Sequence, residues 1–391
     1  MTPRRGATSS ERTAAAREGD RMAESEVFLS NTRVTPKRNL TAKVRGLALR
    51  AGLRELDLEK KFVAIKIHFG EPGNLAFIRP NYAALIAAMV KEAGGKPFLT
   101  DTNSLYSGKR SNALDHLTAA AHNGFNSLTV GCDVIIADGL KGTEFQDIPV
   151  DLKHTRTAKI GSGVAVADVV ISLNHFKGHE LTGIGGAIKN LGMGCGSRGG
   201  KLFMHSTSKP QLDQDKCVAC GVCVESCSQS AIFFNPAKRA QIDYDKCIGC
   251  GQCIAMCQYR ATKAVLNESA SNAAEKIAEY ALAVVKDKPC LHISFITDVS
   301  PFCDCWGHND TPLVADIGFA ASRDPVAIDR ACVDLVNEAP LNPGSMLDGR
   351  GIEPGSDKFG VVHPNTNWRA GLDYAESIGL GTQSYKLVMV E

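Results

Sequence analysis

Apolar runs of strand length alternate with alanine-rich stretches of helical periodicity over most of the 391 residues. Runs rich in Val, Ile, Leu and Phe predict strands at residues 62–69, 96–102, 132–139, 168–176, 290–298, 313–322 and 385–391. Apolar residues at helical spacing predict helices at residues 82–94, 113–124, 267–287 and 324–339. Because strands that alternate with helices form βαβ units, we expect an α/β domain with a mostly parallel sheet.

A cysteine repeat interrupts this pattern. DKCVACGVCVESC (215–227) recurs as DKCIGCGQCIAMC (245–257), and both copies have the spacing C-x2-C-x2-C-x3-C. We therefore expect residues 210–265 to be an insertion between two parts of one α/β domain, residues 25–209 and residues 266–391. Residues 1–24 carry no apolar stretch and are expected to form a disordered tail.

The cysteine spacing predicts two [4Fe–4S] clusters. The first three cysteines of a copy suit the corners of a cubane, and the fourth lies a helical turn further on, where it faces the other cluster. The expected ligands are Cys217, Cys220, Cys223 and Cys257 for one cluster, and Cys247, Cys250, Cys253 and Cys227 for the other. Two structural zinc ions are the alternative, although zinc sites usually separate their C-x2-C pairs by a longer stretch. Disulfides are disfavoured in a reducing compartment.

Residues 210–265 resemble a bacterial two-cluster ferredoxin, an α+β fold. The segment AIFFNPAKRAQID between the two copies fits the short hairpin of that fold. The family usually has proline after the fourth cysteine, where Ser228 and Gln258 stand here. This departure bears on local turn geometry and reduction potential, not on ligation.

Charge and apolar content narrow the expected partners. Lys and Arg number 44 against 42 Asp and Glu, so the net charge of +2 gives no reason to expect nucleic acid or an anionic membrane surface. No apolar run approaches the roughly 18 residues of a membrane-spanning helix. The first 24 residues contain no apolar core of a secretory signal, and we expect a cytoplasmic protein whose 14 cysteines are reduced.

Polar side chains follow six of the predicted strands, and we expect these strand ends to meet at one rim of the sheet. Ligands of α/β proteins bind at the carboxyl ends of parallel strands. The candidate catalytic residues are His68, His175, Lys177 and His179, as proton donors or clamps for a small anionic substrate. The alternative is that such residues are ordinary turn formers.

The segment from Lys177 to Lys201 is unusually rich in glycine, with nine glycines and four cations. Exposed backbone N–H groups ahead of a helix would form an anion-binding concavity. The glycine spacing matches neither a P-loop nor a full dinucleotide fingerprint. The alternative is that the glycines let this segment pack against the insertion. Cys195 either contacts a substrate or is a small buried residue.

Cys303, Cys305 and His308 form a second cysteine-containing group. Two thiolates and an imidazole could bind an additional metal ion, but C-x-C spacing alone is not diagnostic, and the cysteines could equally be inert loop residues. Cys132, Cys290 and Cys332 lie in apolar strand or helix patterns and are expected in the core.

Taken together, the chain resembles an uncharacterised Fe–S centre protein family built on the domain of unknown function 362. The resemblance rests on SLNHFKGHELTGIGGAIKNLGMGC (172–195), the eight cysteines of the repeat, CDCWGHNDTPLVADIG (303–318) and DPVAID (324–329). It implies [4Fe–4S] binding and a redox role, and it implies no substrate.

The leading hypothesis is an iron–sulfur redox protein, an oxidoreductase whose clusters exchange single electrons with a reaction at the strand rim and with a redox partner protein. The alternative is a non-enzymatic electron carrier or cluster-delivery protein that uses the α/β domain for docking. A nucleotide-binding module with regulatory clusters is a third hypothesis. The pattern specifies neither the substrate nor the oligomeric state.

Overall fold

The computed structural model describes residues 24–105, 108–205, 209–227, 229–247, 252–257, 259, 261–263 and 268–391. The expected N-terminal tail therefore lies outside the described residues, apart from Glu24, and so does Cys250. Among the helices of the described ranges, none is long and apolar enough to cross a lipid bilayer.

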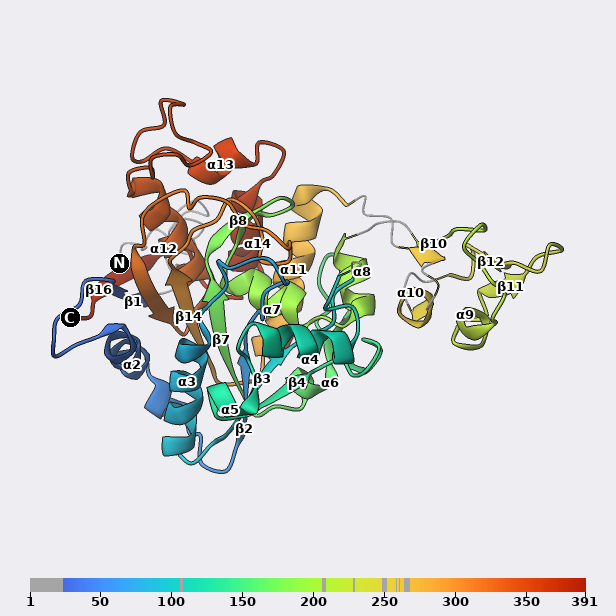
Figure 1. Cartoon of the computed structure of the whole chain (residues 1–391), viewed down its shortest axis with the longest axis horizontal. Coiled ribbons are helices and arrows are strands. Elements are labelled where there is room, and N and C mark those ends of the chain that lie inside the picture. The colour runs from blue at the N-terminus through green and yellow to red at the C-terminus, as the bar shows by residue number, and fades with distance from the viewer. Residues whose placement is uncertain are drawn as a thin grey trace, which may run out of the picture.

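An eight-stranded sheet forms the centre of the molecule (Figure 1). In spatial order its strands are β16 (Tyr385–Met389), β1 (Ser25–Asn31), β15 (Gly318–Ser322), β14 (Cys290–Ile296), β7 (Val169–His175), β2 (Phe62–Lys66), β3 (Lys96–Asp101) and β4 (Asp133–Ile136). Only β15 pairs antiparallel with both neighbours, and the other pairings are parallel. The prediction of an α/β fold with a mostly parallel sheet is confirmed.

Helices cover both faces of the sheet. One face is covered by α2 (Leu40–Arg50), α3 (Pro80–Glu92), α4 (Ala113–His122) and α5 (Ser127–Val130). The other is covered by α7 (Ala187–Cys195), α11 (Ala270–Val285), α12 (Pro325–Glu338) and α14 (Trp368–Ser377). Successive side chains of a strand point to opposite faces of the sheet. Val63 and Ile65 therefore pack with α2 and α3 on one face, whereas Ala64 packs with α7 on the other. Both apolar layers are buried, so the sheet is a rigid support for the strand ends.

The expectation that six strand ends meet at one rim is wrong for β15. The residues after this strand, including Asp324, lie at the opposite edge because β15 runs antiparallel to β14. A loop without helix, residues 297–317, connects the two strands, whereas the crossover between parallel neighbours usually contains a helix. The predicted strand 313–322 begins only at Gly318. Asp324 instead caps α12 through the N–H groups of Val326 and Ala327.

Shorter elements connect the layers. They are η1 (Leu53–Leu56), β5 (Phe145–Pro149), β6 (Thr157–Gly161), α6 (Ser162–Ala165), β8 (Lys177–His179), β9 (Gly183–Gly185), α8 (Arg198–His205) and α13 (Lys358–Val362). Of these, β8, β9 and α8 belong to the glycine-rich segment and follow directly after β7, at the edge of the sheet where the candidate residues lie.

The cysteine repeat forms a small unit beside α8, on the right of Figure 1. Its elements are β10 (Gln211–Leu212), α9 (Val222–Glu225), β11 (Ile232–Phe234), β12 (Ala240–Ile242), α10 (Gln252–Met256) and β13 (Thr262–Lys263). The predicted hairpin is confirmed, because β11 and β12 pair antiparallel. The two copies are related by internal symmetry: Asp213 N–H donates to the carbonyl of Ala261, and Asp243 N–H donates to that of Ala231, both at 2.7 Å.

Candidate functional site

The main cleft lies where β2 and β7 end side by side. The chain leaves β2 towards β3 but leaves β7 towards β14, on the other side. Adjacent strands whose connections diverge create a crevice at their carboxyl ends, which is where α/β sheets bind ligands. The cleft here holds about 750 Å³ of empty space, part of it open to solvent. Its lining includes Lys66 at the end of β2, His68 just after it, and His175 at the end of β7.

Asn190 of α7 holds the two strand ends together. Its side-chain amide donates to the carbonyls of Lys66 at 3.3 Å and Leu173 at 3.0 Å. Its side-chain oxygen accepts a hydrogen bond of 2.8 Å from the Lys66 ammonium. One partly buried amide therefore sets the spacing between β2 and β7 at the mouth of the cleft.

The cleft is strongly cationic. Five cations line it, namely Lys66, Arg110, Lys177, Lys189 and Lys201, and Asp101 is the carboxylate among the lining residues. Lys66 Nζ lies 3.0 Å from Asp101 Oδ1, and both side chains are almost fully buried. Burial alone would raise the pKa of Asp101, but Lys66 and the neighbouring cations hold it well below its usual range. The lining itself therefore carries five cations against one carboxylate, and Glu71 and Asp304 pair with Arg110 and Lys177 from outside it.

All four predicted catalytic residues line this cleft, but His175 is engaged within the protein. Its Nδ1 lies 2.8 Å from the Asp304 carboxylate, and its Nε2 lies 3.0 Å from the carbonyl oxygen of Thr297. Lys177 Nζ lies 3.0 Å from the same carboxylate. His175 therefore ties β7 to the loop 297–317, and it is a positioning residue rather than a free acid.

His68 faces the cleft as a neutral imidazole. Burial and the positive charge of Arg110 lower its pKa well below the ordinary value. Its Nδ1 accepts a hydrogen bond of 3.0 Å from Gly70 N–H, so the ring proton resides on Nε2. His68 can donate a hydrogen bond to a bound anion, but at neutral pH it has no second proton to transfer.

Two cations of the cleft, Arg110 and Lys201, come from segments other than the ends of β2 and β7. Arg110 comes from the loop between β3 and α4, where no strand end or periodic pattern marks it, and sequence reasoning missed it. It is held by Glu71, at 2.8 Å. Lys201 of α8 has a pKa that burial lowers toward neutral, with Asp138 opposing the shift. Lys201 is therefore the cleft amine best suited to give up a proton.

The expected anion-binding helix start is occupied by the protein itself. The first N–H groups of α7, from Ala187 and Ile188, donate to the Asp329 carboxylate of α12 at 2.6 and 3.0 Å. A carboxylate in this position interacts favourably with the helix dipole and occupies the two N–H groups that a ligand would use. The glycines serve close packing: a Cβ on Gly192 would lie 2.1 Å from the Ile277 carbonyl of α11.

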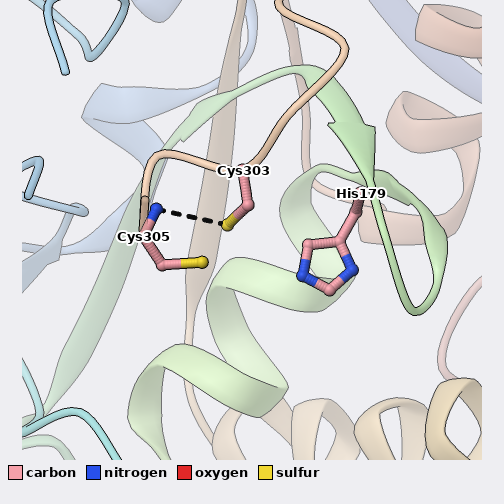
Figure 2. Close-up of side chains that lie close together, drawn as sticks. All are labelled: His179, Cys303 and Cys305. Carbon is pink, nitrogen blue, oxygen red and sulfur yellow. Dashed lines mark hydrogen bonds between the residues drawn. The ribbon is translucent and has the colours of Figure 1, made fainter. Parts of the chain in front are cut away.

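A second group of side chains borders the cleft. His179, Cys303 and Cys305 bring ligand atoms within 4.8 Å of one another, and this group could hold a metal ion (Figure 2). His308 does not belong to it: it is exposed and contacts the ring of Phe302. The structure thus pairs the C-x-C motif with a histidine that is distant in sequence, which a local spacing argument could not find.

The two sulfurs have different surroundings. Lys189 Nζ lies 3.1 Å from Cys303 Sγ, and Cys305 N–H donates to the same sulfur at 3.4 Å. A hydrogen bond from the Cys305 thiol, together with Lys189 and His179, lowers the pKa of Cys303 despite its burial. Conversely, the pKa of Cys305 is raised because its thiol donates to Cys303. Cys303 is thus the thiolate of the pair, and Cys305 lines the cleft.

Four cysteines of the repeat line one cavity of about 290 Å³ in the small unit: Cys217, Cys220, Cys223 and Cys257. The first three belong to one copy and the last to the other copy. Backbone N–H groups point at the sulfurs, with Ala240 donating to Cys217 at 3.4 Å and Ala261 donating to Cys257 at 3.3 Å. This donor set suits a thiolate-ligated metal group.

The remaining cysteines behave as expected for the core. Cys132, Cys290 and Cys332 are buried among apolar side chains. Cys195 is also fully buried, and burial raises its pKa to about 11, so it is a small core residue rather than a substrate contact.

Comparison with known proteins places the chain in a family. The family described as "Domain of unknown function (DUF362)" matches residues 63–334. Over 134 residues the chain is 31% identical to "Thylakoid-associated protein sll1697" of Synechocystis sp.. This match covers 34% of the chain and only 38% of the length of that relative.

Two solved structures are similar at low identity. The lactate racemase apoprotein from Thermoanaerobacterium thermosaccharolyticum aligns with a TM-score of 0.40 and 12% identity, over 82% of this chain and 59% of that one. A protein from Thermotoga maritima aligns with a TM-score of 0.33 and 10% identity, over 65% of this chain and 50% of that one. Because the family match spans more than half of its residues, the chain belongs to the DUF362 domain family.

Proposed function

We propose that the chain is an iron–sulfur redox protein in which residues 210–265, inserted into one α/β domain, bind two [4Fe–4S] clusters. The first would be held by Cys217, Cys220, Cys223 and Cys257, and the second by Cys247, Cys250, Cys253 and Cys227. Each bound cluster carries one electron at a time. The observation that carries this proposal is the cavity on which four cysteines from both copies converge.

The spacing of these cysteines favours a cluster over a single ion. A tetrahedral zinc ion with bonds of about 2.3 Å would hold its sulfurs roughly 3.8 Å apart. The first three cysteines of each copy fall within seven residues, which crowds the ligands of a single tetrahedral ion. A cubane carries its thiolates on separate iron corners, and this spacing suits it.

Internal symmetry extends the argument to the second cluster, although Cys250 lies outside the described residues. Cys227 accepts a hydrogen bond of 3.3 Å from Ala231 N–H, as Cys257 does from Ala261 N–H. The fourth cysteines of the two copies therefore have equivalent surroundings. Since Cys257 joins the first three cysteines of the other copy, we infer that Cys227 does the same.

The small unit is coupled to the cleft. Leu105 lines the cleft and also belongs to the apolar cluster that contains Leu202 of α8 and the buried cysteines Cys217, Cys223 and Cys253. This contact supports an electron path between the clusters and the strand ends. Cys220 is exposed, which leaves one edge of the unit accessible to a redox partner protein in the cytoplasm.

We infer that the reaction at the cleft involves a small anion. Lys177, Lys189 and Arg110 would clamp it, and His68 would donate a hydrogen bond from Nε2. Lys201 would supply a proton when the bound substrate is reduced. The protein would then be an oxidoreductase rather than a carrier alone.

The proposal is tested by anaerobic isolation and reduction with dithionite, followed by EPR spectroscopy. We expect the signal of two interacting reduced [4Fe–4S] clusters in the native protein. Cys257→Ala should remove the cluster held with Cys217, whereas Cys332→Ala, a buried cysteine outside the unit, should leave the signal intact. A native protein without any [4Fe–4S] signal after reconstitution would refute the proposal.

A further inference from the structure

We propose that Cys303 and Cys305 form a reversible dithiol–disulfide couple at the edge of the cleft, which exchanges electrons with the two clusters and controls the binding of the anion. This inference rests on the proposed function for its electron supply. It assigns to the C-x-C motif a two-electron role that neither a metal site nor an inert loop would have.

The geometry brings two thiols together with a cation. The sulfurs of Cys303 and Cys305 lie within 4.8 Å of each other, on a loop whose backbone N–H at Cys305 already points at the Cys303 sulfur. Lys189 Nζ lies 3.1 Å from Cys303 and neutralises a thiolate there. A thiolate next to a cation, with a second thiol in reach, is the arrangement that forms and breaks disulfides.

The orientation of His179 argues against a metal ion on these residues. Its Nδ1 accepts hydrogen bonds from the backbone N–H groups of Leu181 and Thr182, at 3.2 and 3.1 Å, and the Thr182 hydroxyl lies 2.9 Å away. A neutral ring that accepts at Nδ1 carries its proton on Nε2, and Figure 2 shows that nitrogen on the side of the sulfurs. A metal-binding histidine has the opposite pattern, because it donates its outer N–H to an acceptor. His179 Nε2–H instead stabilises the Cys303 thiolate.

The oxidation balances with the groups named. The Cys303 thiolate and the Cys305 thiol lose two electrons, the S–H bond of Cys305 breaks, one S–S bond forms and one proton leaves into the cleft that Cys305 lines. The two clusters take up one electron each. Reduction runs the same steps in reverse.

Oxidation also changes the charge of the cleft. In the dithiol state Lys189 is paired with the Cys303 thiolate, but a disulfide carries no charge and leaves the Lys189 ammonium, which lines the cleft, without that partner. We therefore expect an inorganic anion such as phosphate to bind about tenfold more tightly to the disulfide form. By linkage, phosphate should favour the disulfide.

The experiment uses the anaerobically isolated full chain, equilibrated in thiol–disulfide buffers of graded potential and then alkylated. Trypsin releases residues 287–323 as one peptide, which contains Cys290, Cys303 and Cys305 and none of the eight repeat cysteines. We expect this peptide to lose two hydrogen masses reversibly as the potential rises. Cys303→Ser and Cys305→Ser should abolish the change, and Cys290→Ser should retain it.

Phosphate binding to the two redox forms gives the second readout. The tenfold difference should disappear in Lys189→Met while the peptide still forms its disulfide. Two results would overturn the inference: both thiols remaining reduced across all buffers, or a zinc or iron ion beyond the cluster iron that is lost in both serine variants. Because cluster content is measured separately by EPR, failure of the couple is distinguishable from failure of the clusters.

Discussion

Neutralising Asp101 should destabilise the protein and at the same time strengthen anion binding. Asp101 is the carboxylate that opposes the cations of the cleft: Lys66 lies 3.0 Å and Arg110 4.0 Å from its oxygens. Asp101→Asn keeps the shape of the side chain and removes its charge. The substitution therefore leaves a buried cluster of positive charge without its counter-ion.

The size of the effect follows from the distances. At an effective dielectric constant of about 20, two charges 3.0 Å apart attract by about 5.5 kcal/mol. Breaking a buried ion pair by removing one partner typically costs about 3–5 kcal/mol. We expect Asp101→Asn to lower the free energy of unfolding by about 3–5 kcal/mol. The decrease should be smaller for Lys66→Met, because Arg110 still faces Asp101 in that variant.

Chemical denaturation under anaerobic conditions, followed by tryptophan fluorescence, measures the loss. Trp306 and Trp368, the two tryptophans of the chain, both lie outside the cysteine unit. The control is Asp57→Asn, which removes an ion pair of similar length, 2.8 Å to Lys61, at an exposed position. Solvent screening limits that loss to about 1 kcal/mol or less.

Phosphate titration of the same variants supplies the functional half of this prediction. Asp101→Asn should bind phosphate more tightly than the native protein, because repulsion between the carboxylate and the anion is gone. If Asp101→Asn proved as stable as Asp57→Asn, or bound phosphate more weakly than the native protein, the electrostatic account of the cleft would be wrong.

Three further predictions concern packing, acid sensitivity and coupling. Gly192→Ala should lower the free energy of unfolding by about 1–3 kcal/mol, because the added methyl group overpacks α7 against a carbonyl of α11. Gly46→Ala in α2 meets only a flexible side chain and should raise the free energy of unfolding by up to about 1 kcal/mol. Thermal unfolding of the two variants measures the difference. Burial alone would raise the pKa of Asp101, but Lys66 lowers it below its ordinary value. The ionised Asp101 therefore stabilises the protein above about pH 4, and this stabilisation is lost as the pH falls below that value. Acid denaturation of Asp101→Asn should lack this loss. Leu105→Ala should lower the free energy of unfolding by about 2–4 kcal/mol. The same variant should slow the re-oxidation of the reduced clusters by the disulfide, which stopped-flow absorbance measures. An unchanged rate would exclude Leu105 from the electron path.

Periodicity was sufficient to predict the α/β architecture. The runs at 62–69 and 168–176 are rich in Val, Ile, Leu and Phe, and they form β2 and β7, which are buried on both faces as parallel strands usually are. Strand direction does not follow from such a pattern, because an apolar run reads the same in either direction. The antiparallel placement of β15 depends on the path of the loop 297–317, in which residues 299–312 match no predicted strand or helix.

The sequence predicts which strand-end residues lie at the cleft, but it does not predict their partners. Residues directly after a strand, such as His68, are brought to the rim by topology, so their position follows from the sequence. The partners that define their chemistry come from distant segments. The Asp304 carboxylate contacts the side chains of both His175 and Lys177. His179, rather than His308, lies beside the two cysteines of the C-x-C motif. Such pairings depend on three-dimensional packing and have no local sequence signature.

The metal content of the anaerobically purified protein tests the central claim most directly. Iron, acid-labile sulfide and zinc are quantified per chain, and Mössbauer spectroscopy identifies the state of the iron. Two [4Fe–4S] clusters on the repeat cysteines predict about eight iron and eight sulfide atoms per chain, all in cubane environments. Two zinc ions per chain with negligible sulfide would contradict the account.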